Sequence, residues 1–150
     1  MKINQHSLNK KIISKSEKET IAAGRELTRD IHSGKIIGLE GNLGSGKTVF
    51  VKGLAEGIGC TASEVISSPT FKLFNTYTGR ILLYHIDLYR LVTVEEIIQT
   101  GILDLLTGES LIAIEWAEKI KPLMIDFDYY VQFEYISDKK RRIKIKSPSA

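Results

Sequence analysis

Residues 41–48 read Gly-Asn-Leu-Gly-Ser-Gly-Lys-Thr, which satisfies the pattern G-x-x-x-x-G-K-[ST] of a phosphate-binding loop. The apolar segment 35–40 before the loop predicts a strand, and residues 47–56 after it predict a helix that ends near Gly57. Glycines let successive backbone N–H groups point at phosphate oxygens, and the helix N-terminus adds a favourable dipole. The chain is therefore expected to contain a strand–loop–helix unit that binds a nucleotide.

The residues of this loop have distinct expected roles. Lys47 is expected to neutralise charge on the β- and γ-phosphates, and the Thr48 hydroxyl is expected to bind the Mg²⁺ that bridges them. The expected nucleotide-binding residues are Asn42, Leu43, Gly44, Ser45, Gly46, Lys47, Thr48 and Val49. Because the chain has no [NT]KxD segment of the kind that identifies guanine, ATP is the expected nucleotide.

Two further expected strands end in an acidic residue. Residues 81–87 end in Asp87, and residues 111–115 end in Glu115. If these strands run parallel to the strand before the loop, both carboxylates lie at the sheet edge where α/β proteins bind ligands. Asp87 and Glu115 are therefore candidate Mg²⁺ ligands and catalytic acids. Their spacing does not decide which one binds the metal and which one orients the attacking water.

Four other residues are weaker candidates. Thr70 follows Ser-Ser-Pro, so it is either a hydroxyl held near the γ-phosphate, as in a switch loop, or part of a plain turn. His85 alternates with Asp87, which fits a packed or surface histidine better than a catalytic one. Trp116 fits a core residue, a lid over the site or an anchor for a partner. Arg90 is the candidate arginine finger within the chain.

The remaining patterns predict one small α/β domain over residues 1–150, with a mixed sheet and flanking helices of the P-loop NTPase type. A helix is expected over residues 16–33, and one or two short helices over 94–106. Residues 128–147 predict a terminal β-hairpin, and residues 1–10 a loose arm.

The net charge of +3 arises from one segment. Residues 139–146 hold six basic and no acidic side chains, whereas the rest of the chain has 15 basic and 18 acidic ones. Alternation of these bases with Ile143 and Ile145 predicts a strand with one buried face, whose lysines protect an exposed sheet edge. The alternative interpretation is a rim that contacts tRNA or a partner.

Several classes of protein are disfavoured by the composition. The apolar runs are short and no apolar segment marks a secretory signal, so a cytoplasmic protein without a membrane span is expected. Cys60 is the only cysteine, which excludes an internal disulfide and a multi-cysteine metal site. The near absence of basic residues from 88–110 disfavours a metabolite kinase.

Five segments together resemble the TsaE (YjeE) family. They are the loop 41–48, Ser-Pro-Thr-Phe at 68–71, His-Ile-Asp-Leu-Tyr-Arg-Leu at 85–91, Glu-Glu at 95–96 with Gly101, and Glu-Trp at 115–116. The resemblance covers roughly residues 35–120. It implies a bacterial ATPase that works with TsaB and TsaD in the threonylcarbamoyl modification of adenosine in tRNA.

The resemblance also implies roles for individual residues. Lys47 and Thr48 would bind phosphate and Mg²⁺, Thr70 would act like a switch threonine, and Trp116 would be a functional neighbour of the metal and water site formed by Asp87 and Glu115. The leading hypothesis is thus a weak ATPase that its partners stimulate. A nucleotide-dependent RNA-binding module and a small-molecule kinase are the alternatives.

Overall fold

The computed structural model describes residues 8–61 and 73–147. The strands of this part of the chain are β1 Asn9–Ser14, β2 Ile36–Glu40, β3 Phe74–Thr78, β4 Leu82–Asp87, β5 Leu111–Glu115, β6 Tyr129–Ser137 and β7 Lys140–Lys146. Its helices are α1 Glu17–Thr28, α2 Lys47–Gly57 and α3 Val94–Gln99, with two 3-10 helices, η1 Ile102–Thr107 and η2 Ala117–Leu123.

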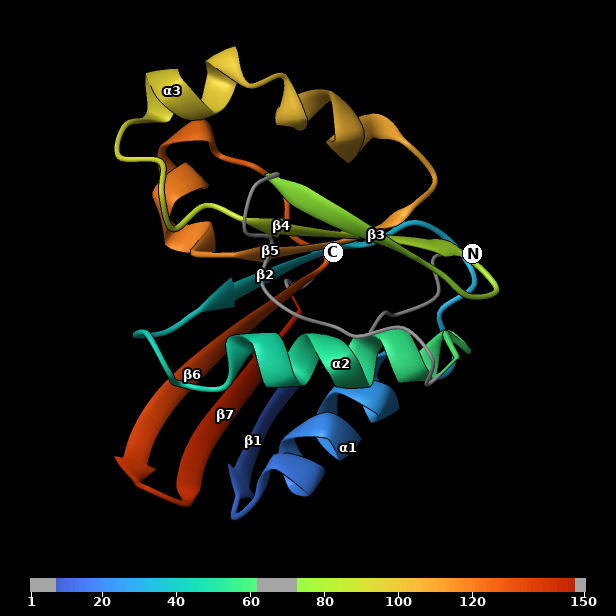
Figure 1. The fold of residues 1–150 in the computed structure, drawn as a ribbon, viewed down its shortest axis with the longest axis vertical. Coiled ribbons are helices and arrows are strands. Elements are labelled where there is room, and N and C mark those ends of the chain that lie inside the picture. The colour runs from blue at the N-terminus through green and yellow to red at the C-terminus, as the bar shows by residue number, and fades with distance from the viewer. Residues whose placement is uncertain (1–7, 62–72, 148–150) are drawn as a thin grey trace.

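The strands form one mixed sheet in the order β1-β7-β6-β2-β5-β4-β3. The central strands β6, β2, β5 and β4 run parallel, whereas β1, β7 and β3 are antiparallel to their neighbours. Helices α1 and α2 cover one face, and α3, η1 and η2 cover the other (Figure 1). The expected α/β fold with a mixed sheet and flanking helices is confirmed.

Strand β5 shows how the sheet separates two cores. Leu111 and Ala113 pack with α2 residues such as Phe50, whereas Ile112 and Ile114 pack on the face that α3 and η2 cover. Because side chains alternate along a strand, Glu115 belongs to the same face as Leu111 and Ala113. That face is the one on which α2 begins, so the strand period directs this carboxylate toward the phosphate-binding loop.

Helices α1 and α2 pack closely through glycines. A Cβ added to Gly53 would lie 2.1 Å from the backbone oxygen of Ile21, and one added to Gly24 would lie 2.3 Å from that of Phe50. Only residues without a side chain allow this approach. The glycines therefore hold the helix that begins at the phosphate-binding loop tightly against α1.

Helix α1 begins as its sequence predicts but ends earlier. The Ser16 side chain accepts a hydrogen bond from the Glu19 N–H at 3.1 Å, which is the expected N-cap. The helix ends at Thr28 rather than near residue 33. At this end the Thr28 hydroxyl donates to the backbone oxygen of Leu54, and Arg80 donates to the backbone oxygens of Thr28 and Arg29.

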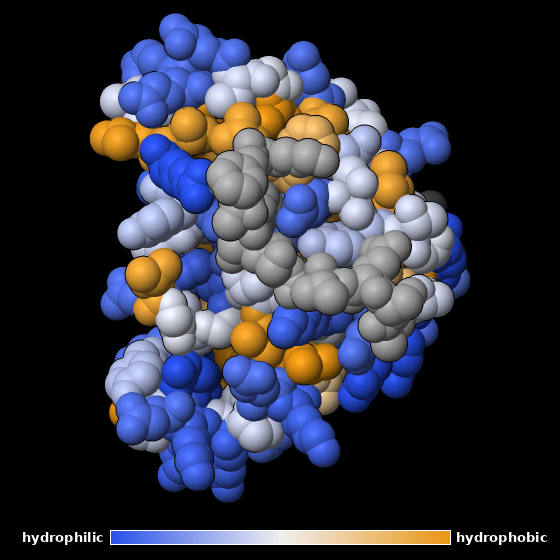
Figure 2. Space-filling model, in the orientation of Figure 1, coloured by the Kyte–Doolittle hydropathy of each residue, from blue (hydrophilic) through white to orange (hydrophobic). Residues whose placement is uncertain are grey.

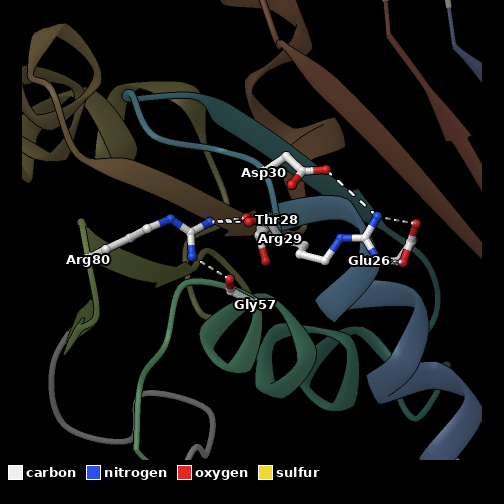
Figure 3. A network of polar contacts seen from close by, with 6 residues as sticks. All are labelled: Glu26, Thr28, Arg29, Asp30, Gly57 and Arg80. Carbon is white, nitrogen blue, oxygen red and sulfur yellow. Dashed lines mark hydrogen bonds and ion pairs between the residues drawn. The ribbon is translucent and has the colours of Figure 1, made fainter.

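Arg80, in the β3–β4 turn, joins the C-terminal ends of α1 and α2 (Figure 3). Its guanidinium donates to the backbone oxygen atoms of Thr28, Arg29, Ile31 and Gly57 at 2.5–3.0 Å. A positive charge at helix C-termini is favourable because the last carbonyls have no partner within the helix. One side chain thus closes both helices at the end away from the phosphate-binding loop.

The structure corrects two expectations about the ends of the chain. Residues 9 and 10 are not part of a loose arm, because they begin β1, which pairs with β7 along its length. Strand β7 is therefore not a sheet edge, and its lysines do not protect one; the edge is β1. The alternation in β7 is confirmed, since Ile143 and Ile145 are buried. The sequence does not predict β1, because Lys10 and Lys11 interrupt the alternation of apolar and polar residues that indicates a strand.

The face of the molecule in Figure 2 is mostly hydrophilic, with hydrophobic residues gathered below α3. Tyr89, Val92 and Ile98, in α3 and the segment before it, are exposed large hydrophobic residues. No helix within residues 8–61 and 73–147 is long and apolar enough to cross a membrane.

Candidate active site

Three parallel strands bring the predicted site residues to one edge of the sheet. Asp87 at the end of β4 is the register partner of Glu115 at the end of β5, and β2 beside them leads into the phosphate-binding loop. A cavity of about 310 Å³ at this edge is lined by Leu43, Gly44, Ser45, Gly46, Lys47, Thr48, Val49, Leu73, Asp87, Tyr89, Arg90, Glu115 and Trp116. Of the predicted site residues that the structure describes, all except Asn42 line this cavity.

The loop has the backbone that its glycines permit. Gly44 and Gly46 both have positive φ angles, of 75° and 108°, and α2 begins directly after Gly46. Asn42 accepts a hydrogen bond from the Ser45 N–H through its backbone oxygen, so it contributes main chain to the turn. The first N–H groups of α2 therefore face the cavity, where they suit an anionic group.

Lys47 is nearly buried at the base of the cavity. Its ammonium donates to the backbone oxygen atoms of Gly41 and Asn42, and it lies 4.3 Å from the centre of the Trp116 ring. Burial lowers the pKa of Lys47, while the charges of Glu115, Glu118 and Asp87 act to raise it. The cation is thus held by two backbone oxygens of the loop and by the face of the Trp116 ring, within reach of an anion bound in the cavity.

Glu115 is buried and touches two side chains. The Thr48 hydroxyl donates to its carboxylate, at 3.1 Å from Oε1 and 3.0 Å from Oε2. The Nε2 atom of His85 lies 2.5 Å from Oε2. The carboxylate therefore connects the first turn of α2 to the end of β4.

Asp87 is the second carboxylate of the cavity. Its Oδ1 atom accepts a hydrogen bond from the Tyr89 N–H at 3.0 Å. Burial raises the pKa of Asp87, the Tyr89 N–H acts against this, and the charge of Glu115 raises the pKa further. Two carboxylates that disfavour each other's charge form a site that a cation stabilises.

The oxygen atoms of Thr48, Asp87 and Glu115 fit a magnesium ion. Mg²⁺ in nucleotide sites takes one or two carboxylates and a hydroxyl together with phosphate oxygens, and these residues supply such oxygen donors. Within residues 8–61 and 73–147 no group of three or more histidine, cysteine, aspartate and glutamate side chains is placed to hold a metal ion.

Trp116 forms one wall of the cavity in a strained conformation. Its φ of 62° is rare for a residue with a side chain, and its ring lies 5.3 Å from that of Tyr89. Lys119 fixes the segment opposite by donating to the backbone oxygen atoms of Leu88, Tyr89 and Leu91 at 2.8–3.0 Å. Trp116 was expected to be a core residue, a lid over the site or an anchor for a partner. Its position in the wall of the cavity resembles the lid most.

The terminal strands reach the other side of the loop. Arg141 of β7 donates to the backbone oxygen of Gly44 at 3.3 Å. A second cavity of about 540 Å³ is lined by residues of β1, α1, the loop and the β6–β7 turn: Ser14, Lys15, Ser16, Glu17, Thr20, Gly44, Gly46, Val49, Asp138, Lys139 and Arg141. Gly44 and Gly46 therefore line both cavities.

One predicted site residue cannot be placed, and two contacts of the site were not predicted from the sequence. Thr70 lies outside the described residues. Arg90 lines the cavity but is exposed. The contacts of His85 with Glu115 and of Arg141 with the loop were missed, although the alternation of His85 with Asp87 was a usable signal. The Arg141 contact has no local signal because it joins residues 97 positions apart.

The fold and the site define a P-loop NTPase, with a phosphate-binding loop at the carboxyl end of a parallel strand and acids at the ends of its neighbours. The family model described as "Threonylcarbamoyl adenosine biosynthesis protein TsaE" matches residues 14–143. The chain belongs to the TsaE family.

Individual relatives agree with this assignment. The tRNA threonylcarbamoyladenosine biosynthesis protein TsaE of Treponema pallidum is 35% identical, over 89% of this chain and 97% of that protein. The protein of the same name from Aquifex aeolicus is 36% identical, over 92% and 96%. The crystal structure of Bacillus subtilis YdiB has a TM-score of 0.77 and 27% identity, covering 95% of this chain and 88% of that one.

Proposed function

We propose that this chain is the ATP-hydrolysing component of the cytoplasmic machinery that makes threonylcarbamoyladenosine in tRNA, where it works with TsaB and TsaD. Its relatives carry the name of this pathway. The observation that carries the proposal is the cavity itself, where Lys47, Thr48, Asp87 and Glu115 meet at one edge of the sheet. Slow hydrolysis by the chain alone and faster hydrolysis with its partners are expected.

Within this proposal each residue has a definite task. The loop N–H groups and Lys47 bind the β- and γ-phosphates, and adenosine lies in the second cavity beyond Gly44 and Gly46. Thr48, Asp87 and Glu115 would hold Mg²⁺, which would neutralise phosphate charge. One of the two acids also orients the attacking water.

Weak hydrolysis by the isolated chain has a physical reason. P-loop enzymes gain a large rate factor from an arginine that stabilises charge on the transferred phosphoryl group. Arg90, on the exposed rim of the cavity, is the candidate within the chain. A partner that closes over this rim would either position Arg90 or supply its own cation beside the transferred phosphoryl group.

The test measures phosphate release from ATP by this chain alone and together with TsaB and TsaD from the same source. We expect turnover that depends on Mg²⁺ and rises when the partners are added. A matched control is Lys52→Ala, which removes a lysine of α2 that does not line either cavity. Lack of both stimulation and association would refute the proposal.

The same experiment separates the two alternatives. A metabolite kinase would move labelled γ-phosphate to a small molecule instead of water. An RNA-binding module would bind tRNA alone with a steep dependence on salt, because lysine and arginine contacts release counterions. The basic segment 139–146 is the place for such contact, either in this alternative or within the modification complex.

A further inference from the structure

We propose that His85 is a positioning residue for ATP hydrolysis, which holds the Glu115 carboxylate in the orientation that the Mg²⁺ and water site needs. The inference rests on the proposed ATPase function. It assigns a task to a buried histidine that the phosphate-binding loop and the two acids leave unexplained.

The first support is the environment of His85. Its side chain is 0% exposed, and its Nε2 atom lies 2.5 Å from Oε2 of Glu115. The Nδ1 atom is buried, and the described residues provide no hydrogen-bond partner for it. A polar ring in this position loses hydration, and the one contact that compensates for the loss is the contact with Glu115.

The contact also fixes which ring nitrogen carries the proton. A carboxylate oxygen accepts, so Nε2 must donate its N–H to Glu115. The contact therefore requires a proton on Nε2.

The second support is the geometry around Glu115. His85 binds Oε2, and the Thr48 hydroxyl bridges both oxygens at 3.0 and 3.1 Å. With Oε2 held by a ring fixed in the core, the carboxylate cannot rotate freely, and Oε1 stays toward Thr48 and the cavity. A residue that orients a metal-binding side chain in this way typically contributes about 10- to 100-fold in metal affinity or activity.

Strand geometry explains why a histidine at this position reaches Glu115. His85 and Asp87 lie two positions apart on β4 and so point to the same face, and β5 runs beside them in register. Asp87 is the register partner of Glu115 at the cavity. His85 lies two residues earlier on β4, opposite Ala113, and contacts the Glu115 carboxylate from the buried side. One strand therefore supplies both an acid of the site and the support for the other acid.

Two variants test the proposal. Gln places a side-chain N–H near the position of Nε2, whereas Leu fills the space without a donor. We expect His85→Gln to keep most of the wild-type kcat, and His85→Leu to lose about 10- to 100-fold in kcat and to have a higher KM for ATP in the presence of Mg²⁺. Thermal unfolding shows that each variant is folded. Equal kcat values for wild type and His85→Leu would overturn the proposal.

Two further measurements do not depend on activity. Calorimetric titration with ADP should show that Mg²⁺ increases the affinity of the wild type and of His85→Gln, but not of His85→Leu, while the affinity without Mg²⁺ is unchanged. Long-range ¹H–¹⁵N spectra should show His85 protonated at Nε2. An Nε2 atom without a proton, or an equal gain from Mg²⁺ in His85→Leu, would refute the inference. If the wild type proved inactive with its partners, only the proposed function would fail.

Discussion

Arg80 offers the clearest test of what holds the phosphate-binding helix in place. Its guanidinium donates to four backbone oxygens at the ends of α1 and α2. Replacement by alanine leaves these carbonyls to water and removes a positive charge from two helix C-termini. The Arg80→Ala protein should therefore be less stable, although no residue of the cavity is changed.

The size of the effect follows from the exposure of the site. A hydrogen bond to a charged group contributes about 1.5–3 kcal/mol, but Arg80 is exposed and water replaces much of what is lost. The free energy of unfolding should fall by about 2 kcal/mol in total. For a chain of this size that lowers Tm by about 4–8 °C.

The assay is thermal unfolding followed by circular dichroism, with Arg29→Ala as the matched control. Arg29 lies beside Arg80 in Figure 3 but pairs with Glu26 and Asp30 on the surface, where such pairs contribute little. Arg80→Lys should fall between Arg80→Ala and the wild type, because one ammonium cannot reach all four carbonyls. If Arg80→Ala unfolds no lower than Arg29→Ala, the assigned role of Arg80 is wrong.

The other predictions concern the cavity and α2. Lys47→Ala should abolish ATP binding in calorimetry, since the phosphates lose their main cation; retained affinity would contradict this. Asp87→Ala and Glu115→Ala should keep ATP binding but lose hydrolysis, and wild-type turnover in both would refute the site. Asp87→Asn should melt higher than the wild type near neutral pH, because burial raises the pKa of Asp87. The folded protein then holds this proton more tightly than the unfolded chain, so wild-type stability falls as pH rises above the normal range of aspartate, and the gain should shrink in acid. Gly53→Ala should destabilise by about 1–3 kcal/mol in denaturant unfolding, because its Cβ would lie 2.1 Å from the Ile21 oxygen; unchanged stability would show that α1 moves away freely.

The site was largely predictable because its residues follow local rules. The glycine pattern of 41–48 and the acids that end two apolar strands are visible in short windows of sequence, and parallel strands bring such ends together. The fold class follows from the same strand–loop–helix unit. These features depend on neighbours in the chain and on the period of a strand.

The remainder depends on contacts between distant residues. The basic strand β7 was expected to be the sheet edge, but it pairs with β1, which is the edge instead. No local sequence pattern indicates a strand partner so far away in the chain. The carbonyls at the C-terminus of α1 are bound by Arg80, about 50 residues later. The contact of His85 with Glu115 likewise needs the register of two strands 30 residues apart.

Pairing of β1 with β7 also orders the events of folding. Asn9 lies opposite Lys146, so the first described strand has its only sheet neighbour near the other end of the chain. Closing so long a loop costs entropy that local contacts do not compensate, and contacts of this range form slowly. During synthesis β1 must wait until β7 has left the ribosome, whereas β2, α2, β4 and β5 are already complete. The cavity that holds Asp87, Glu115 and the phosphate-binding loop is therefore built from segments made before β7, whereas the second cavity, beyond Gly44 and Gly46, is completed only when β1 and β7 have formed.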